Sequence, residues 1–370
     1  MKKKEMENDF LKIDDIKNTI IEGDTIENLK KIPDDSIDLI FADPPYFMQT
    51  EGELHRTDGS KFQGVDDEWD KFSNYNEYDK FCFEWLKECK RVLKKDGSIW
   101  VIGSFQNIYR LGYIMQNLDY WILNDIIWSK PNAAPNFAGT RYQNSHETLI
   151  WCTKSKKSKY TFNYKTMKYL NNDKQDKSVW DIGICIGNER LKGDDGKKIH
   201  STQKPEKLLY KVILSTSKPN DIVLDPFFGT GTTGAMAKLL GRNYIGIERE
   251  HEYNIAAKNR IDKIIPLNDD ISNLKLEVKP PKVPMKKLLE VGMIKEDESL
   301  YDKNGKEICK VKIDGNVYDN EETLSIHKMS AKYLNRTNNN GWDYFYVKED
   351  GLIPIDKLRY DYINMEVNNG

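Results

Sequence analysis

The stretch DIVLDPFFGTGTTG, residues 221–234, decides the fold. Its first half is typical of a buried strand that ends at Asp225, and its second half of a glycine turn that opens a helix. The turn matches GxGxxG, in which glycines let a ligand approach the backbone, and Glu248 ends the next strand, where an acid can hold ribose hydroxyls. The pattern predicts a nucleotide-binding α/β unit, and by itself leaves a nicotinamide dinucleotide or a purely structural turn open.

Apolar runs of strand length alternate with helical patterns along the first three quarters of the chain. Strands are predicted at 18–24, 36–43, 99–104, 120–130, 146–154, 221–225 and 243–250. Helices are predicted at 25–33, at 77–94, from Pro205 onward and after the glycine turn. This alternation favours a doubly wound, mostly parallel sheet.

The proline-rich run KPPKVPM, residues 279–285, interrupts the alternation and predicts an extended linker. We therefore expect one large domain over residues 1–278 and a small α+β domain over 286–370, where short strands and turns replace strong helices. In the second domain Trp342, Tyr344 and Tyr346 alternate, which predicts the core face of a strand.

The composition predicts a soluble protein without metal or disulfides. Among 370 residues 38% are hydrophobic, and no apolar run reaches the length that spans a bilayer. The N-terminal residues lack the apolar core of a signal peptide, so we expect a cytoplasmic protein with no membrane partner. The five cysteines are odd in number and form no CxxC, which favours reduced thiols.

Two motifs resemble those of S-adenosylmethionine-dependent methyltransferases that act on exocyclic amino groups. One is DPFFG, residues 225–229, which resembles their cofactor loop, and the other is DPPY, residues 43–46, which resembles their catalytic tetrapeptide. Asp-Pro-Pro also commonly ends a strand, so DPPY alone would fit a structural turn as well as a catalytic motif. The two motifs together favour the methyltransferase.

The chemistry explains the composition of DPPY. The N6 amine of adenine is a poor nucleophile because its lone pair is conjugated into the ring. Asp43 and the carbonyl of Pro44 can accept its two protons as hydrogen bonds and favour an sp³-like transition state. Pro44 and Pro45 restrict the backbone, and Tyr46 offers a face for a base flipped out of the duplex. Phe47 is expected to add a second wall.

The order of the motifs indicates a circular permutation. If residues 221–225 form the first strand of the usual cycle and 243–250 the second, then 18–24 and 36–43 are the third and fourth. This order is that of the β group of DNA amino-methyltransferases, and the chain resembles the GANTC-specific adenine-N6 members of that group. The resemblance covers nearly the whole chain and rests on these segments: FADPPYFMQTEG, GVDDEWDKF, GSIWVIGSFQNIYRLGYIMQNL, STQKPEKLLYKVI, LDPFFGTGTTGAMAKLLGRNYIGIERE and ETLSIHKMSAKYLNRTNNNGWDYFYV.

The resemblance implies a Rossmann-like class I methyltransferase that flips adenine out of double-stranded DNA at GANTC, methylates N6 from S-adenosylmethionine and forms no covalent intermediate. The implied catalytic residues are Asp43, Pro44, Pro45 and Tyr46. The implied cofactor residues are Asp24, Lys204, Asp225, Phe227, Gly229, Gly231, Thr232 and Glu248. A homodimer, a cognate restriction endonuclease, or action as an orphan methylase are further expectations.

Two regions are expected to contact DNA. Residues 154–177 hold eight lysines and two aspartates interleaved with aromatics, within an expected target-recognition insert of about 154–200, although charge alone favours a solvated loop. The second is the loop before the aromatics of the C-terminal domain. The expected DNA-binding residues are Lys156, Lys157, Lys159, Arg190, Lys332, Arg336, Asn338 and Asn339. The insert QTEGELHRTDGSKFQGVDDEWDKF, residues 49–72, is expected to close over the flipped base.

Several other functions remain as alternatives. A cytosine-N4 methyltransferase of the same fold usually has serine in place of Asp43, and a protein-amide methyltransferase typically begins its tetrapeptide with asparagine. An RNA methyltransferase is a more distant alternative. A non-catalytic DNA-binding protein would not need an intact DPPY and glycine loop. A dehydrogenase would need a hydride-handling His or Lys and gives DPPY no role.

Overall fold

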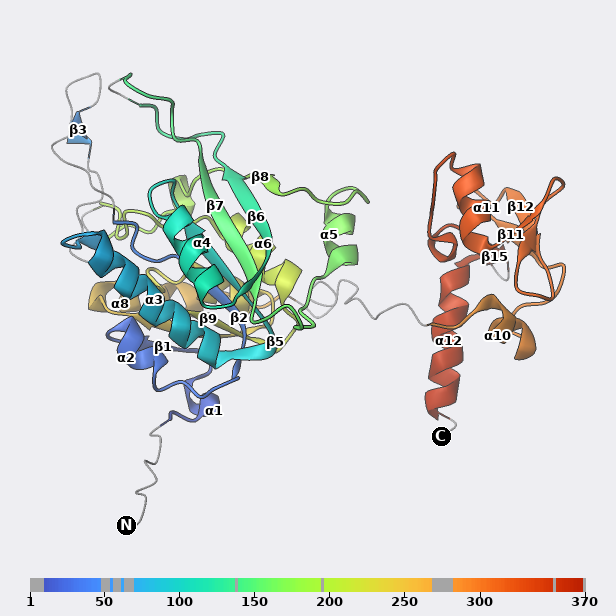
Figure 1. Cartoon of the computed structure of the whole chain (residues 1–370), viewed down its shortest axis with the longest axis horizontal. Coiled ribbons are helices and arrows are strands. Elements are labelled where there is room, and N and C mark those ends of the chain that lie inside the picture. The colour runs from blue at the N-terminus through green and yellow to red at the C-terminus, as the bar shows by residue number, and fades with distance from the viewer. Residues whose placement is uncertain are drawn as a thin grey trace, which may run out of the picture. The chain divides into compact units, whose positions relative to one another are not determined.

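The computed structural model of the chain describes residues 10–47, 54–55, 61–62, 70–136, 139–193, 196–267, 282–348 and 351–368. The chain divides into two compact units, Met1–Leu276 and Glu277–Gly370 (Figure 1). Most of the insert predicted to close over the base, and the first half of the predicted linker, lie outside the described residues.

The first unit holds an eight-stranded sheet and its helices. The strands of the sheet are β1 (Thr19–Glu22), β2 (Ile37–Ala42), β5 (Leu93–Gly103), β6 (Trp121–Ser129), β7 (His146–Thr153), β8 (Val179–Asp181), β9 (Ile222–Asp225) and β10 (Asn243–Glu248). The helices are α1 (Ile13–Ile16), α2 (Thr25–Leu29), α3 (Tyr75–Val92), α4 (Ile108–Asn117), α5 (Tyr164–Leu170), α6 (Glu206–Thr216), α7 (Thr232–Leu239) and α8 (His251–Asp262), with a 3₁₀ turn, η2, at Gly187–Glu189. A separate pair is formed by β3 (Leu54–His55) and β4 (Lys61–Phe62).

The sheet order is β1-β10-β9-β2-β5-β7-β6-β8. The first five strands of this order are parallel, and β7 runs antiparallel to both β5 and β6. Strands from early and late in the sequence thus pair directly, because β1 lies against β10 and β2 against β9. This order confirms the predicted doubly wound sheet and its circular permutation.

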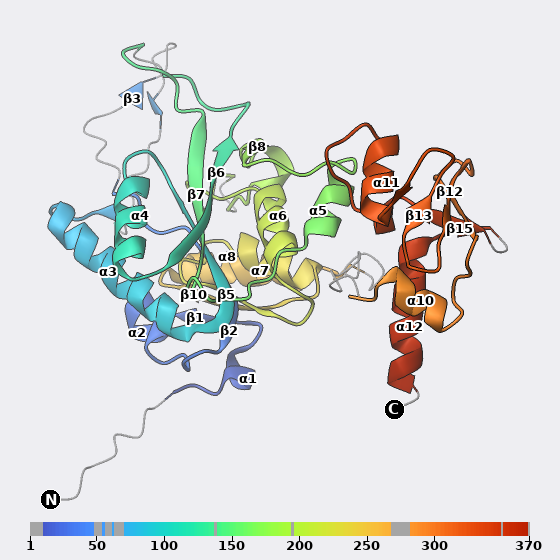
Figure 2. The same cartoon turned by 45° about the vertical axis from the view of Figure 1, so that its right-hand side comes forward.

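Alternating residues of the buried strands build a core on each face of the sheet. In β2, Ile40 packs into the cluster that contains α3 and α4, whereas Leu39 and Phe41 pack into the cluster that contains α6 and α7. A strand that is covered on both faces must be largely apolar, which explains the apolar run over residues 39–42 of β2. Figure 2 shows helices on both sides of the strands.

In the residues that the structure describes, the second unit is a six-stranded antiparallel sheet with three helices, as the α+β prediction requires. Its strand order is β14-β13-β12-β11-β15-β16. The elements are α10 (Met285–Glu290), β11 (Ser299–Tyr301), β12 (Glu307–Val311), β13 (Val317–Tyr318), β14 (Thr323–Leu324), α11 (Ile326–Tyr333), the 3₁₀ turn η3 (Gly341–Asp343), β15 (Tyr346–Lys348), β16 (Leu352–Pro354) and α12 (Ile355–Asn368). Met285, predicted to end the linker, instead begins α10.

The prediction that Trp342, Tyr344 and Tyr346 line one face of a strand is wrong. Trp342 lies in η3, where it is buried and packs under the guanidinium of Arg359 at 4.5 Å. The strand begins only at Tyr346, and its buried residue is Val347. The aromatic alternation therefore crosses the junction between a turn and a strand.

Candidate active site

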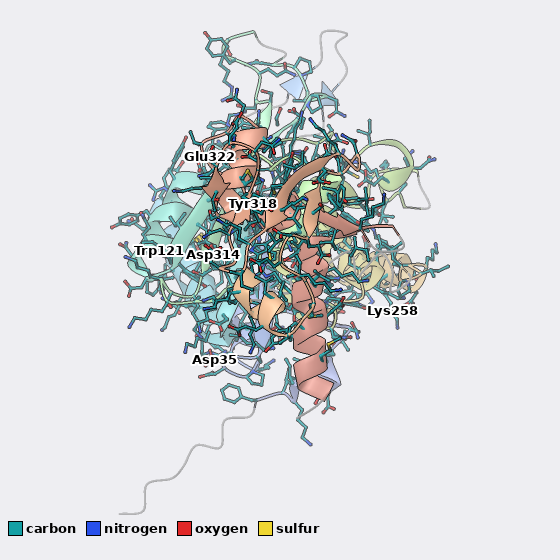
Figure 3. All side chains as sticks on the ribbon, turned by 90° about the vertical axis from the view of Figure 1, so that its right-hand side faces the viewer. Asp35, Trp121, Lys258, Asp314, Tyr318 and Glu322 are labelled. Atoms are coloured by element: carbon teal, nitrogen blue, oxygen red, sulfur yellow. The ribbon has the colours of Figure 1, made fainter. Side chains whose placement is uncertain are left out.

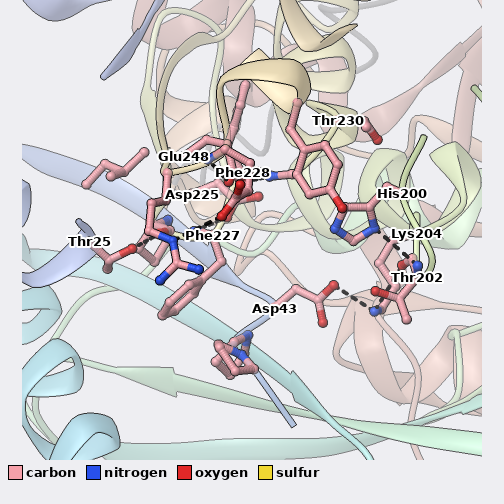
Figure 4. Close-up of a pocket in the computed structure, with 18 of the residues that line it drawn as sticks. Thr25, Asp43, His200, Thr202, Lys204, Asp225, Phe227, Phe228, Thr230 and Glu248 are labelled. Carbon is pink, nitrogen blue, oxygen red and sulfur yellow. Dashed lines mark hydrogen bonds and ion pairs between the residues drawn. The ribbon is translucent and has the colours of Figure 1, made fainter. Parts of the chain in front are cut away.

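A cavity of about 330 Å³ opens at the carboxyl ends of β1, β2, β9 and β10 (Figure 4). It brings together all of the predicted catalytic residues and every predicted cofactor residue except Gly231. The predicted residues that line it are Asp24, Asp43, Pro44, Pro45, Tyr46, Lys204, Asp225, Phe227, Gly229, Thr232 and Glu248. Residues separated by some 200 positions in sequence thus share one cavity, because the permuted strands are neighbours in the sheet.

The turn that carries DPPY is held from outside the motif. One oxygen of Asp70 accepts from the backbone N–H groups of Tyr46 and Phe47, at 2.6 and 2.7 Å. The hydroxyl of Tyr78 on α3 donates to the carbonyl of Pro45 at 2.8 Å. Phe47 has a positive φ of 51° and packs on Tyr78, with ring centroids 5.7 Å apart. Phe47 is therefore part of the core, and does not line the cavity as the sequence suggested.

The carboxylate of Asp43 lies in a cluster of charged groups at one end of the cavity. Its Oδ2 accepts from Lys204 Nζ at 2.6 Å, and its Oδ1 accepts from the Tyr46 hydroxyl at 2.9 Å. The same hydroxyl lies 3.1 Å from Glu147 Oε2, and Glu147 is in turn ion-paired with Lys130. Lys204, predicted to hold the cofactor, is thus bound to the carboxylate that is predicted to be catalytic.

Burial and charge oppose each other in this cluster. Burial raises the pKa of Asp43, although Lys204 counteracts part of the shift. Burial also raises the pKa of Glu147, but Lys204 and Lys130 outweigh it and leave that pKa lowered. Burial lowers the pKa of Lys204, and the carboxylates of Asp43 and Glu147 reverse this into a raised pKa. The cluster therefore contains two ammonium groups that face two carboxyl groups.

The glycine turn shapes the opposite wall of the cavity. Gly229 has φ of +51°, and its N–H donates to Glu248 Oε2 at 2.7 Å. Gly231 has φ of +75°, and a Cβ there would lie 2.8 Å from the Cβ of Ala257 on α8. Both positions need glycine, but for different reasons. Gly229 brings backbone to the cavity, whereas Gly231 allows α7 to pack on α8.

Asp225 is buried and uses both carboxyl oxygens within the protein. Oδ1 accepts from the N–H of Phe227 at 2.9 Å, and Oδ2 accepts from the Thr233 hydroxyl at 2.6 Å. Burial raises the pKa of Asp225 to about 7, although these hydrogen bonds oppose the shift. Asp225 therefore fixes the loop that presents Phe227, whose ring packs edge-on against Trp85 at 5.2 Å.

Thr232 ties the glycine turn to the segment that carries Lys204. Its hydroxyl donates to the carbonyl of Lys204 at 3.2 Å and accepts from Arg260 Nη1 at 2.8 Å. The other guanidinium nitrogen of Arg260 donates to Glu206 at 2.7 Å. The hydroxyl predicted to contact the cofactor thus has protein partners, and Arg260 was not predicted at all.

Asp24 and Glu248 lie at the ends of β1 and β10. Asp24 caps α2, with Oδ1 accepting from the N–H of Glu27 at 3.0 Å. Glu248 accepts backbone N–H groups from Gly229 and Glu250, and burial raises the pKa of its carboxyl. Each acid lines the cavity, and its position is fixed by the backbone of the neighbouring turn or helix.

His200, at the end of the expected target-recognition insert, covers the glycine turn and was not predicted to line the cavity. Its Nδ1 accepts from the N–H of Thr202 at 3.1 Å, and its ring lies 4.8 Å from that of Tyr253. Burial lowers the pKa of His200 to about 3, and Lys204 adds to the shift. The imidazole is therefore neutral at pH 7 and contributes a ring, and not a charge, to the cavity.

Two residues predicted to contact DNA have other partners. The guanidinium of Arg190 donates to the carbonyls of Cys185, His200 and Ser201, at 2.9 to 3.3 Å. Arg190 therefore clamps its own loop. Lys332 lies 2.7 to 3.1 Å from three carboxylates, and these are Asp319, Glu321 and Glu322. Its charge is neutralised within the second unit, and its expected contact with the groove edges of DNA stays a prediction.

The first residues of the lysine-rich segment, 154–159, lie at the opposite edge of the sheet from the cavity. Because β7 is antiparallel, Thr153 at its end pairs with Ser98 near the amino end of the parallel strands. The N–H of Lys159 then donates to Asp96 at 2.7 Å. Six residues of strand separate the two edges by about 20 Å. Lys156, Lys157 and Lys159 are exposed but do not lie beside the cavity, so their contact with DNA stays a prediction.

Other exposed residues of that edge and of the second unit can be placed. Lys156 Nζ lies 5.0 Å over the ring of Trp121, which Figure 3 labels at the start of β6. In the second unit, Arg336 and Asn338 are exposed after α11. Asn339 donates to the Ser330 hydroxyl at 3.2 Å. Arg336 and Asn338 are therefore the predicted DNA residues of this unit with the most accessible side chains.

The comparisons with known proteins agree with this geometry. The N6/N4 methyltransferase family, described as DNA methylase, matches residues 37–259. The chain belongs to this family of DNA methyltransferases, as predicted. It is similar to the type II methyltransferase M.HinfI of Haemophilus influenzae, with 67% identity over 362 residues, 98% of this chain and 99% of that protein. It is also 42% identical to M2.LlaDCHI of Lactococcus lactis subsp. cremoris over 246 residues, 66% of this chain and 89% of that protein.

Solved structures share the fold. The complex of M1.HpyAVI with S-adenosylmethionine has a TM-score of 0.50 and 27% identity, and covers 66% of this chain and 98% of that chain. The PvuII cytosine-N4-specific DNA methyltransferase has a TM-score of 0.52 and 23% identity over 70% of this chain and 93% of that chain, a likeness of fold alone. S-adenosylmethionine as cofactor is confirmed at the level of the family. None of the helices that the structure describes is long and apolar enough to cross a bilayer.

Proposed function

We propose that the chain methylates the N6 amine of adenine in double-stranded DNA, at GANTC, by direct transfer from S-adenosylmethionine to a base flipped out of the duplex. The observation that carries the proposal is that the Asp43 carboxylate and the glycine turn line one cavity, with Tyr46 beside them. A base and a cofactor must meet in one place for a methyl group to pass directly between them.

The residues of DPPY have distinct roles in the proposed reaction. Asp43 accepts one N6 proton as a hydrogen bond, and the carbonyl of Pro44 accepts the other. Tyr46 lies beneath the base, with its hydroxyl fixed by Asp43 and Glu147. The hydrogen bonds from Asp70 and Tyr78 hold the turn before the substrate arrives, so little ordering remains for the reaction itself.

The opposite wall fits S-adenosylmethionine by its donor set and shape. Glu248 and Asp24 supply carboxylates suited to hydroxyl and amino groups, and Phe227 supplies an aromatic face. At Gly229 an added Cβ would lie 3.3 Å from His200, so the wall there is backbone only. The bound cofactor supplies an electrophilic methyl group on a sulfonium. We propose Lys204 as a partner of Asp43 more than of the cofactor.

We further propose that the connection between β6 and β7 is the first contact with DNA near the target base. Figure 1 shows this connection between the labelled strands β6 and β7. Its first residue, Lys130, is paired with Glu147 of the catalytic cluster, which indicates that the loop leaves the sheet at the edge of the cavity. The loop has two basic residues, Lys130 and Arg141, and no acid. The side chain of Tyr142 is 98% exposed and available to stack on a base.

The recognition site rests on the resemblance to GANTC-specific members of the β group. The match to M.HinfI covers 98% of this chain, so it includes the second unit, for which we propose base contacts through Arg336 and Asn338. We also propose that the chain forms a homodimer in the cytoplasm. It acts there either with a partner endonuclease or independently.

The test is to incubate the purified chain with S-adenosylmethionine and an unmethylated plasmid, and then to map modified bases by sequencing. We expect N6-methyladenine in every GANTC. A matched plasmid in which each GANTC is changed by one base pair serves as the control and is expected to stay unmodified. Modified cytosine would instead support the cytosine-N4 alternative, and adenine methylation at another sequence would refute the recognition site alone.

A further inference from the structure

Both oxygens of the Asp43 carboxylate already have donors in the cavity. Oδ1 accepts from Tyr46 at 2.9 Å, and Oδ2 accepts from Lys204 at 2.6 Å. The proposed function requires an oxygen of Asp43 to accept a hydrogen bond from the adenine amine. Each oxygen can accept a second hydrogen bond. An oxygen that already binds a donor is a weaker acceptor, so the departure of one donor would strengthen the hydrogen bond to the base.

Lys204 cannot move into water, because its side chain is only 7% exposed. A desolvated ammonium group that leaves one carboxylate needs another negatively charged partner. Glu147 is in reach, since its Oε2 lies 3.9 Å from Lys204 Nζ. A movement of about 1 Å at the end of the flexible lysine chain would bring the two within hydrogen-bond distance.

Glu147 is well fixed to receive this ammonium group. It lies near the start of β7, where Lys130 pairs with Oε1 and the Tyr46 hydroxyl lies 3.1 Å from Oε2. Its side chain is 14% exposed, so water competes little for the carboxylate. Neither the catalytic motif nor the cofactor motifs include this residue.

We propose that Glu147 is a positioning residue for methyl transfer. When the adenine amine binds, the ammonium group of Lys204 leaves Asp43 and pairs with Glu147. Asp43 Oδ2 then accepts the N6–H hydrogen bond, and the Tyr46 hydroxyl keeps its place. No covalent bond forms or breaks in this exchange, and the same two ammonium and two carboxylate groups face one another before and after it. The inference rests on the proposed function, because it gives the exchange its purpose.

The exchange predicts a pH signature for Glu147→Gln, which keeps the size of the side chain and an acceptor for Tyr46. The charged or titratable groups that face Asp43 are Lys204, Tyr46, Glu147 and Asp225. Burial raises the pKa of Asp43, and the charge of Glu147 contributes to the rise. Removing that charge lowers the pKa, so the acidic limb of the kcat profile moves to lower pH. The plateau of kcat falls at the same time, because Lys204 stays on Asp43.

The experiment compares the wild-type enzyme, E147Q and E147D on a duplex with one GANTC site. We expect kcat of E147Q to fall roughly 10- to 100-fold with the dissociation constant for S-adenosylmethionine unchanged, and E147D to recover part of the loss. Glu88→Gln is the matched control, since Glu88 is 13% exposed and ion-paired but lies on α3, away from the cavity. Its kinetics and pH profile should equal those of the wild type.

A crystal structure with duplex and a non-reactive cofactor analogue provides the direct test. We expect Lys204 Nζ within about 3.2 Å of Glu147 and no longer bound to Asp43. An ammonium group that stays on Asp43 Oδ2 would overturn the inference, as would wild-type kcat and pH dependence in E147Q. An inactive wild type would reject the proposed function together with the inference, whereas an active wild type with a normal E147Q would reject the inference alone.

Discussion

Lys204 Nζ and Asp43 Oδ2 form a 2.6 Å ion pair across 161 residues of sequence. The pair joins the turn that carries DPPY, after β2, to the segment before α6. We predict that Asp43→Asn, which keeps the size of the side chain, lowers kcat at least about 100-fold. The neutral amide oxygen of asparagine is a weaker hydrogen-bond acceptor for the adenine amine than the negatively charged carboxylate. Calorimetric titration with S-adenosylmethionine should give a dissociation constant within a few-fold of the wild-type value, and normal methylation by this variant would remove the role given to Asp43.

Buried Asp225 predicts an unusual pH dependence of stability. Its carboxyl titrates near pH 7 in the folded protein, well above the ordinary value of 3.8. Between these pH values the folded state binds a proton that the unfolded state lacks. The free energy of unfolding therefore falls by on the order of 1.4 kcal/mol for each pH unit as pH rises from about 4 to 7, and it then levels off.

The variant Asp225→Asn isolates this effect because it cannot ionise. We expect the Tm of D225N minus that of the wild type to increase from pH 4 to pH 7 and to remain constant above. Thermal unfolding followed by circular dichroism at several pH values measures the difference. A difference that does not vary with pH would show that Asp225 titrates normally.

Arg260 is predicted to stabilise the wall of the cavity. Its guanidinium joins Thr232 to Glu206 and is almost fully buried, so Arg260→Met should lower the free energy of unfolding by about 2–4 kcal/mol. The exposed pair Arg249–Glu250 supplies the control, since Arg249→Met should cost no more than about 0.5 kcal/mol. Urea unfolding measures the free energy of unfolding of both variants. Equal losses in the two variants would contradict the stabilising role given to Arg260.

Arg336 and Lys332 lie close in sequence but should respond differently to substitution. Exposed Arg336 is proposed to contact DNA, so Arg336→Ala should weaken binding of the duplex and reduce its salt dependence by about one charge. Lys332 is bound to three carboxylates, so Lys332→Met should lower Tm and leave the salt dependence unchanged. Fluorescence anisotropy over a salt series separates the two, and the reverse result would restore Lys332 as the DNA contact.

Tyr142 tests the proposed contact of the β6–β7 loop with DNA. Tyr142→Ala should weaken DNA binding about 10-fold through loss of base stacking, whereas Tyr142→Phe should retain it. A duplex with 2-aminopurine at the target adenine reports base flipping by its fluorescence. Equal fluorescence and affinity for both variants would show that the loop does not reach the bases.

Local patterns predicted the sheet well because its strands are buried on both faces. Residues 39–42 of β2, 222–224 of β9 and 244–247 of β10 are free of charged residues and mostly apolar, and the acids at the ends of these strands then fall at one edge by the rules of parallel sheets. The motifs also predicted the walls of the cavity, since DPPY and the glycine turn follow adjacent strands. The fold and most of the candidate site were therefore readable from short segments.

The residues missed by sequence analysis act through contacts made only in the folded chain. Asp70 and Tyr78 bind the backbone of the catalytic turn, and no spacing rule links them to it. Glu147 left one signal, an acid two residues before the apolar run of β7. The place of the lysine-rich segment was not readable for a related reason. Its composition shows charge but does not show that β7 reverses direction and carries the first residues of the segment to the other edge of the sheet.

The permuted strand order separates the two halves of the chemistry along the chain. DPPY, Glu147 and Lys204 all precede β9, and the glycine turn with Glu248 follows it, and the two sets meet through the pairing of β2 with β9 and the hydrogen bond of Thr232 to Lys204. A chain cut between α6 and β9 would therefore yield an acceptor fragment and a cofactor fragment, each inert alone. Fusing the fragments to partners that dimerise on a chemical signal would turn the enzyme into a split reporter, whose methyl marks on DNA record when the partners met.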